Sequence, residues 1–382
     1  MKRVAVLGST GSVGENALRV IEAEPRRFQA VALAAGSNYQ RLSEQISRHR
    51  PLMASICAER APELCQTFTD YSPRVEEGEP GLCRMAAMPE ADTVLIALSG
   101  AAALAPALAA VRAGKTVALA NKECMVMAGE LLMSEAEKSG SLILPVDSEH
   151  SGVFQALAER PIERVRRIIL PASGGPFLDT ASADLEYVTP EEALSHPTWS
   201  MGQKISIDSA TLMNKALEII EARWLFGIEH SRIEVLIHPE SIVHALVEFK
   251  DGSVIAQMSV PDMRFPILYA LSYPERPDIG LPPLELAELG TLSFRNPDHG
   301  RFPAPGLAYK ALDMGGDAPA VFAAADEEAV DAFLSGNIKF SRIVEIIAEV
   351  LLNHRPGPVS TIEQAKEADA SARERVRQII GS

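Results

Sequence analysis

The sequence predicts an α/β chain with three parts: an N-terminal parallel-sheet domain, a middle α+β domain and a C-terminal helical bundle. Two observations support this prediction. In the first 145 residues, short apolar runs alternate with helical patterns, which is typical of βαβ units with helices on both faces of a sheet. Beyond them, apolar runs follow one another closely, and the chain then ends in helical patterns alone.

The N-terminal sheet is predicted from five apolar runs: Arg3–Leu7, Gln29–Ala34, Thr93–Leu98, Thr116–Leu119 and Leu142–Pro145. Four further strands are expected in the middle domain, at Arg167–Leu170, Ile233–Ile237, Ser241–Phe249 and Ser253–Ser259. Lys250-Asp251-Gly252 separates the last two and predicts a hairpin. We therefore expect at least one antiparallel pair there.

The best amphipathic helix is predicted over Ala210–Phe226. Its apolar stripe is Met213, Leu217, Ile220 and Trp224. Another face carries Thr211, Asn214, Lys215 and Glu218, and Asp208 or Ser209 would cap the helix. A proline-rich connecting segment follows, and then helices at Ala318–Leu334, Ser341–Asn353 and Thr361–Ile380. The expected divisions are residues 1–146, 147–271, 272–297 (connecting) and 298–382.

Charge and cysteine content exclude several classes of protein. The 36 Lys and Arg against 51 Asp and Glu give a net charge of −15, without a long basic run. Such a chain repels nucleic acid and anionic membrane surfaces.

The four cysteines form no C-x-x-C pair, which predicts reduced thiols rather than a zinc or dithiol site. A strand begins almost at residue 1, leaving no room for a signal peptide, so we expect a cytoplasmic protein.

A glycine-rich turn, Gly8-Ser-Thr-Gly11-Ser-Val-Gly14, directly follows the first strand and opens a helix. Glycines there let the backbone approach a pyrophosphate at the helix N-terminus, as in Rossmann-like domains. A tight turn without a ligand is the alternative. The second strand ends in Gly36-Ser37-Asn38 with no carboxylate, and Arg41 follows, which favours NADP over NAD.

Polar groups also follow the later strands. Asn121-Lys122-Glu123 follows one strand, and Asp147 and Glu149 follow the next, on one side of an extended segment. Together with Glu218, Asp147 and Glu149 make three carboxylates without His or Cys partners, a set that suits Mg²⁺ or Mn²⁺. A solvated acidic loop and a solvated Lys–Glu pair are the alternatives.

Two segments of the middle domain have no regular period. The turn Ala172–Phe177 contains small residues and a hydroxyl that could bind an anion, and a plain turn is its alternative. The segment from His196 to Gly202 carries Trp199 and could form a lid over a substrate. A surface loop is equally compatible with it.

Taken together, these segments resemble the 1-deoxy-D-xylulose 5-phosphate reductoisomerase family over nearly the whole chain. The motifs that carry the resemblance are GSTGSVG from Gly8, NKE from Asn121, DSEH from Asp147, ASGGPF from Ala172, HPTWSMGQKISIDSATLMNKALE from His196 and MSVPDM from Met258. The resemblance implies an enzyme that uses NADPH and a divalent cation (Mg²⁺, Mn²⁺ or Co²⁺) to make 2-C-methyl-D-erythritol 4-phosphate for isoprenoid synthesis. It also implies a homodimer formed through the middle domain.

The resemblance assigns roles to residues of this sequence. The cofactor contacts are Thr10, Gly11, Ser12, Val13, Gly36, Ser37, Asn38, Asn121, Glu123 and Gly202. The metal ligands are Asp147, Glu149 and Glu218, the last two also near the sugar phosphate. The remaining substrate contacts are Lys122, Ser148, Ser173, His196, Ser209, Asn214 and Lys215. Lys122, Glu149 and His196 are the expected catalytic residues.

Ser37 departs from the family pattern, because many members carry a basic residue there. Two other functions stay open on the residues alone. One is an aldehyde dehydrogenase with Cys124 as nucleophile, although no His partner is evident. The other is a non-catalytic NADPH-sensing protein, which would need neither three acids nor a phosphate pocket.

Overall fold

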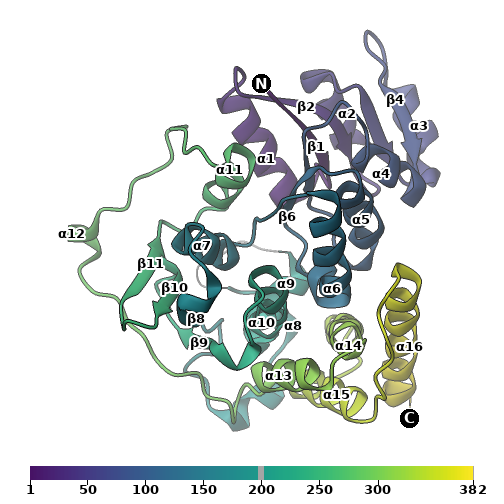
Figure 1. The fold of residues 1–382 in the computed structure, drawn as a ribbon. Coiled ribbons are helices and arrows are strands. Elements are labelled where there is room, and N and C mark those ends of the chain that lie inside the picture. The colour runs from purple at the N-terminus through teal and green to yellow at the C-terminus, as the bar shows by residue number, and fades with distance from the viewer. Residues whose placement is uncertain (197–201, 382) are drawn as a thin grey trace. The chain divides into compact units, whose positions relative to one another are not determined.

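The computed structural model describes residues 1–196 and 202–381. The chain divides into two compact units, each assembled from separate stretches of sequence. Unit 1 comprises Met1–Cys124, Leu132–Ser151 and Asp262–Pro282, and unit 2 comprises Met125–Leu131, Gly152–Pro261 and Pro283–Ser382. The predicted α/β class, with a parallel sheet, a second sheet and a helical C-terminal region, is confirmed (Figure 1).

Unit 1 is built on a seven-stranded sheet in which every neighbouring pair is parallel. In chain order its strands are β1 (Lys2–Leu7), β2 (Phe28–Ala34), β3 (Met53–Ile56), β4 (Arg74–Glu77), β5 (Thr93–Ile96), β6 (Thr116–Leu119) and β7 (Ile143–Pro145). Their spatial order is β4-β3-β2-β1-β5-β6-β7. The chain thus reverses its direction across the sheet next to β1, and ligands of such sheets bind beyond the strand ends at this reversal.

Helices connect these strands and cover the sheet. They are α1 (Ser12–Ala23), α2 (Tyr39–His49), α3 (Ala61–Gln66), α4 (Gly78–Ala86), α5 (Leu104–Arg112) and α6 (Lys122–Ser139), to which the later α11 (Arg264–Ser272) is added. Helix α7 (Ser148–Leu157) follows β7, and its residues from Gly152 onward belong to unit 2. Figure 1 shows α11 beside α1, although about 240 residues separate them in sequence. Val4 to Leu7 on β1 are completely buried, as expected for a strand covered on both faces.

Unit 2 contains a mixed four-stranded sheet in the order β11-β10-β8-β9. The strands are β8 (Val165–Ala172), β9 (Ile233–Ile237), β10 (Val243–Phe249) and β11 (Val254–Met258). β8 and β9 are parallel, whereas β10 pairs antiparallel with both β8 and β11, so the predicted hairpin is confirmed. Helices α8 (Pro190–Ala193), α9 (Gln203–Thr211), α10 (Met213–Phe226) and α12 (Leu286–Leu289) belong to the same unit.

The C-terminal helices are α13 (Ala304–Met314), α14 (Ala318–Leu334), α15 (Phe340–Leu352) and α16 (Ile362–Gly381). In Figure 1, α14 lies beside α15 and α16, and contacts along their lengths confirm this packing. Phe322 and Phe333 of α14 are almost fully buried, and Phe333 meets Phe340 edge-on at 5.6 Å between ring centroids. Short 3₁₀ turns complete the fold at Ala58–Arg60, Gly100–Ala103, Ile162–Arg164, Ser182–Tyr187 and His230–Arg232.

The predicted helix Ala210–Phe226 is wrong in its first part. Leu212 adopts a left-handed backbone conformation (φ 61°), which ends α9 at Thr211 and starts α10 at Met213. A left-handed leucine is strained, and the strain is tolerated because its side chain is buried in the core. Asp208 and Ser209 are therefore inside α9 and are not caps, and Thr211 is the last residue of α9 rather than part of the helix that carries Lys215.

No helix in the described stretches 1–196 and 202–381 is long and apolar enough to cross a membrane.

Candidate functional site

The glycine-rich turn closes onto the ends of β1 and β2. The amides of Gly8 and Ser9 donate to the carbonyl of Ala34 at 2.9 and 2.7 Å. Gly8 has a φ of 95°, and a Cβ there would lie 2.2 Å from the carbonyl oxygen of Ala97. A Cβ on Gly14 would lie 2.2 Å from the carbonyl oxygen of Gly8. Packing of the unit itself therefore requires the first and third glycines of the motif.

The middle glycine of the turn has a different environment. A Cβ on Gly11 would meet only the Gly8 carbonyl oxygen, at an ordinary 3.5 Å. Gly11 is exposed at the N-cap of α1. Its neighbours in sequence are also accessible: Ser12 is exposed, and Thr10 and Val13 are half-buried. The fold therefore leaves open space at the helix N-terminus, where amide groups and the helix dipole favour a phosphate.

Gly36, Ser37 and Asn38 form an exposed turn at the end of β2, at the same sheet edge as the glycine-rich turn. The Asn38 side chain accepts a hydrogen bond from the amide of Arg41 at 3.1 Å and caps α2. Arg41 itself donates to Glu15 of α1 and Glu44 of α2. Hydrogen bonding to Arg41 lowers the pKa of Glu15, so this carboxylate is ionised at neutral pH.

At the end of β6, Asn121 and Lys122 are buried, and Glu123 is half-buried. The Asn121 side chain accepts from the Cys124 amide at 2.8 Å and donates to the Leu98 carbonyl at 2.9 Å. It thereby caps α6 and joins it to the loop after β5. Cys124 is only 1% exposed, which is unlike the partly exposed position of a reactive thiol.

Lys122 faces the acidic motif that follows β7. Its Nζ lies 2.7 Å from Oδ2 of Asp147. Burial alone would raise the pKa of Asp147, but the Lys122 charge, helped by His150, outweighs burial and holds this pKa well below its usual range. The Asp147 carboxylate is therefore ionised at neutral pH.

The segment Asp147–Glu149 is not extended: the chain bends there, as a site shared by Asp147, Ser148 and Glu149 requires. Helix α7 begins at Ser148, directly after Asp147, so Ser148 and Glu149 lie on its first turn. The Ser148 hydroxyl donates to Glu149 at 2.5 Å instead of pointing away from it. In an extended strand, Asp147 and Glu149 would share one side and Ser148 would point to the other, whereas the helical turn brings the Ser148 hydroxyl to Glu149.

In unit 2, Ser173 follows β8 in a turn where Gly174 and Gly175 have φ values of 88° and 65°. The Ser173 hydroxyl lies 3.0 Å from Nε2 of His196. A Cβ on Gly175 would lie 2.7 Å from the carbonyl oxygen of Ser209, so this turn packs tightly against α9. Burial lowers the pKa of His196, which keeps its imidazole neutral at pH 7.

Helix α10 carries three of the predicted residues on its first turns. Asn214 donates to Oε1 of Glu218 at 2.5 Å, and Lys215 pairs with Oε2 of the same carboxylate. Lys215 is 3% exposed and Glu218 is 0% exposed. A buried ion pair is costly to desolvate, so its presence marks α10 as a functional-site candidate rather than a solvated face.

Gly202, the last predicted cofactor contact, is exposed at the N-cap of α9. The lid prediction falls on residues 197–201, including Trp199, which lie outside the described residues.

Sequence reasoning missed one polar group in this unit: Lys204 bonds Asp208 and the buried Asp326 of α14 at 2.5 and 2.6 Å. The spacing of Lys204 and Asp208 was a readable signal, whereas Asp326 joins them only through the fold.

Known proteins resemble this chain along its whole length. Family models match three stretches: 1-deoxy-D-xylulose 5-phosphate reductoisomerase at residues 4–129, its C-terminal domain at 143–226, and the DXP reductoisomerase C-terminal domain at 258–375. The enzyme of this name from Anaeromyxobacter dehalogenans is 53% identical over 100% of this chain and 98% of its own. That from Geobacter metallireducens is 50% identical, with 100% of both chains covered.

Solved structures agree with these relatives. The Zymomonas mobilis reductoisomerase in complex with NADPH has a TM-score of 0.94 and 41% identity, covering 100% of this chain and 99% of its own. A reductoisomerase in complex with NADPH, fosmidomycin and magnesium has a TM-score of 0.93 and 38% identity, covering 100% and 98%. The resemblance inferred from the sequence motifs is confirmed, and the chain belongs to the 1-deoxy-D-xylulose 5-phosphate reductoisomerase family.

Proposed function

We propose that this chain catalyses the NADPH-dependent and divalent-cation-dependent conversion of 1-deoxy-D-xylulose 5-phosphate to 2-C-methyl-D-erythritol 4-phosphate. The observation that carries the proposal is the buried Lys215–Glu218 pair with Asn214, within a chain that matches this family from end to end. A protein that only sensed NADPH would have no use for such a costly buried pair. We further propose that the protein is a cytoplasmic homodimer, with the domain roles predicted from the sequence.

We propose Asp147, Glu149 and Glu218 as the metal ligands. These side chains supply only oxygen donors, which suit Mg²⁺, Mn²⁺ or Co²⁺. The depressed pKa of Asp147 supports this role, because a ligand must be deprotonated to bind a cation. The bound cation would supply Lewis-acid stabilisation of charge on the oxygens of a ketose.

The cationic side chains beside these carboxylates would handle the substrate. Lys122 would donate to the reacting oxygens, since its ammonium is buried and fixed by Asp147. Ser148 and His196 would hold the sugar, with the neutral imidazole of His196 oriented by Ser173. Ser173, Ser209, Asn214 and Lys215 would bind the phosphate and supply binding energy remote from the reacting bonds.

The cofactor would lie along the sheet edge of unit 1, where NADPH supplies the hydride. Thr10, Gly11, Ser12 and Val13 would face its pyrophosphate, and Gly36, Ser37 and Asn38 its adenosine ribose. Asn121, Glu123 and Gly202 would complete the binding site. The open space at Gly11 supports this placement, because the packing of the unit does not use it.

Replacing Gly11 with alanine is expected to leave the fold stable and weaken NADPH binding. The added Cβ meets no protein atom closer than 3.5 Å, but it would occupy the space proposed for the pyrophosphate. We expect a rise of about tenfold or more in the Kd for NADPH, measured by calorimetry. The matched control is Gly14→Ala, whose Cβ would clash with backbone and lower the free energy of unfolding by about 1–3 kcal/mol. Equal NADPH affinity in Gly11→Ala and wild type would contradict the placement.

Ser37→Arg is expected to widen the NADPH:NADH ratio of kcat/KM, mainly through the KM for the cofactor. Ser37 is neutral where a basic residue would make a charge-assisted bond to the 2′-phosphate. The ratio should rise by about tenfold to 150-fold, from a bond of about 1.5–3 kcal/mol to a charged group. Steady-state kinetics with both cofactors measure it. An unchanged ratio would show that the 2′-phosphate lies away from Ser37.

The whole proposal is tested by following NADPH oxidation with 1-deoxy-D-xylulose 5-phosphate, with and without added cation. We expect turnover only when both are present. Turnover that persists in Cys124→Ala would eliminate the dehydrogenase alternative with a cysteine nucleophile. The absence of turnover under all conditions, with NADPH still bound, would favour the NADPH-sensing alternative.

A further inference from the structure

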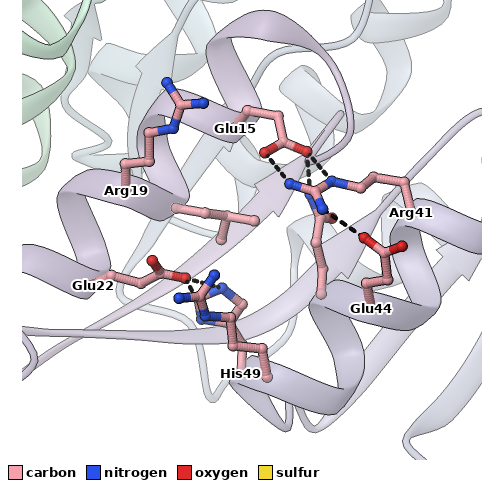
Figure 2. A pocket seen from close by; sticks show the side chains of 9 residues that line it. Glu15, Arg19, Glu22, Arg41, Glu44 and His49 are labelled. Atoms are coloured by element: carbon pink, nitrogen blue, oxygen red, sulfur yellow. Dashed lines mark hydrogen bonds and ion pairs between the residues drawn. The ribbon is translucent and has the colours of Figure 1, made fainter.

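An ion-pair cluster joins the first turns of α1 and α2, next to the two turns proposed to bind the cofactor. Arg41 donates through Nε and Nη2 to the two oxygens of Glu15, at 2.6 and 2.7 Å. Its Nη1 donates to Glu44 at 2.5 Å. Figure 2 shows the guanidinium of Arg41 bound by both carboxylates. The cluster carries one more negative charge than positive.

Glu15 is held in place by the fold. Gln45, 4% exposed, donates through Nε2 to Glu15 at 3.0 Å and to the carbonyl of Ser9 at 2.9 Å. The hydroxyl of Ser9, within the glycine-rich turn, donates back to Gln45 at 2.7 Å. The position of the Glu15 carboxylate is thus coupled to the glycine-rich turn, and the bidentate bond fixes Arg41 in turn.

The cluster also reaches the second cofactor turn. The backbone amide of Arg41 is capped by Asn38, the residue after Ser37. A cavity of about 210 Å³ opens between the two helices, and Glu15, Arg41 and Glu44 are among the residues that line it. Arg41 is 44% exposed, so its long side chain can exchange one anionic partner for another. Ser37 supplies no positive charge, which leaves Arg41 as the cation in the first turn of α2.

We propose that Arg41 determines the preference for NADPH over NADH by binding the 2′-phosphate, and that Glu15 and Glu44 limit this preference by competing for its guanidinium. The inference rests on the proposed function, because it requires NADPH in the site. A phosphate dianion would compete with both carboxylates for the guanidinium charge, and Glu44 is the weaker competitor. It makes one bond where Glu15 makes two, and it is 64% exposed against 22% for Glu15.

The test measures Kd for NADPH and NADH by calorimetry in the absence of substrate, and kcat/KM for both cofactors. Glu44→Gln is expected to raise the NADPH:NADH ratio about threefold to tenfold, because a competing charge is removed. Arg41→Met is expected to lower the ratio by a similar factor or more. The control is Glu63→Gln, since Arg60 and Glu63 form an exposed pair of the same spacing elsewhere in unit 1, and it should leave the ratio unchanged.

Two further measurements test whether Glu44 competes with the 2′-phosphate for Arg41 or only holds the Arg41 side chain in place. The effect of Glu44→Gln should largely vanish in the Arg41→Met background, since no guanidinium is left to release. It should also shrink between about 20 and 500 mM salt, because exposed charges are screened. An unchanged ratio in Arg41→Met, or equal effects of Glu44→Gln in both backgrounds, would overturn the inference. Failure of every variant and the wild type to bind NADPH would instead overturn the proposed cofactor.

Discussion

Glu218→Gln is expected to eliminate nearly all turnover while the protein still folds. Glutamine has almost the shape of glutamate and keeps an oxygen that can accept the hydrogen bond from Asn214. It loses the negative charge, and with it both the charge and the strongest oxygen donor that a hard cation would use. We expect kcat/KM to fall by about 100-fold or more, because each lost 1.4 kcal/mol costs a factor of ten.

The proposed metal role of Glu218 needs a measurement that does not depend on catalysis. Removing the charge also leaves Lys215 with a neutral partner, and we expect the free energy of unfolding to fall by about 1–3 kcal/mol. Direct titration with Mn²⁺ in calorimetry should show weaker cation binding than in wild type. The control is Glu248→Gln, a buried carboxylate paired with Arg167 in the same unit, which should cost stability and spare turnover. Near wild-type activity of Glu218→Gln at ordinary Mn²⁺ would exclude Glu218 from the metal site.

Lys215→Ala is expected to raise KM for the sugar phosphate strongly, with a smaller effect on kcat. An ammonium that binds a distant phosphate acts in the ground state and the transition state alike. An ammonium has three donors, so Lys215 can keep its bond to Glu218 and still reach a phosphate. Losing a hydrogen bond to a charged group costs about 1.5–3 kcal/mol, which corresponds to about a tenfold to 150-fold rise in KM.

Two comparisons make the Lys215 result specific. The unphosphorylated sugar 1-deoxy-D-xylulose should be used about equally by wild type and Lys215→Ala, since it lacks the phosphate that we propose Lys215 binds. Lys339→Ala removes an exposed lysine paired with Glu186 and should leave KM unchanged. If KM for the phosphorylated substrate does not move in Lys215→Ala, the lysine serves only to neutralise Glu218.

The elements predicted well from the sequence are those whose signals are local. The helix expected over Ala318–Leu334 has those bounds in the structure, because a continuous stretch of good helix formers is bounded by Asp317-Ala-Pro and Ser335-Gly336. The turn Gly8–Gly14 is predicted from its glycines. The structure gives the reason at Gly8 and Gly14, where a Cβ would clash with a backbone carbonyl oxygen. The strands β3 and β4 were missed because their sequences, Met-Ala-Ser-Ile and Arg-Val-Glu-Glu, contain few residues that favour strands.

The sequence by itself determined the family and the list of candidate residues, since both depend on residue types at fixed spacings. Only the tertiary structure decided the conformations that run against local preference. Leucine has no intrinsic tendency to break a helix, so the left-handed Leu212 between α9 and α10 reflects burial in the core. The pairing of Arg41 with Glu15 was equally hidden, because two helices separated by a strand must pack before charges 26 residues apart can meet. Lys215 and Glu218 are a further case, because their spacing is typical of a solvated pair. They form a buried ion pair only because the rest of unit 2 excludes water from them.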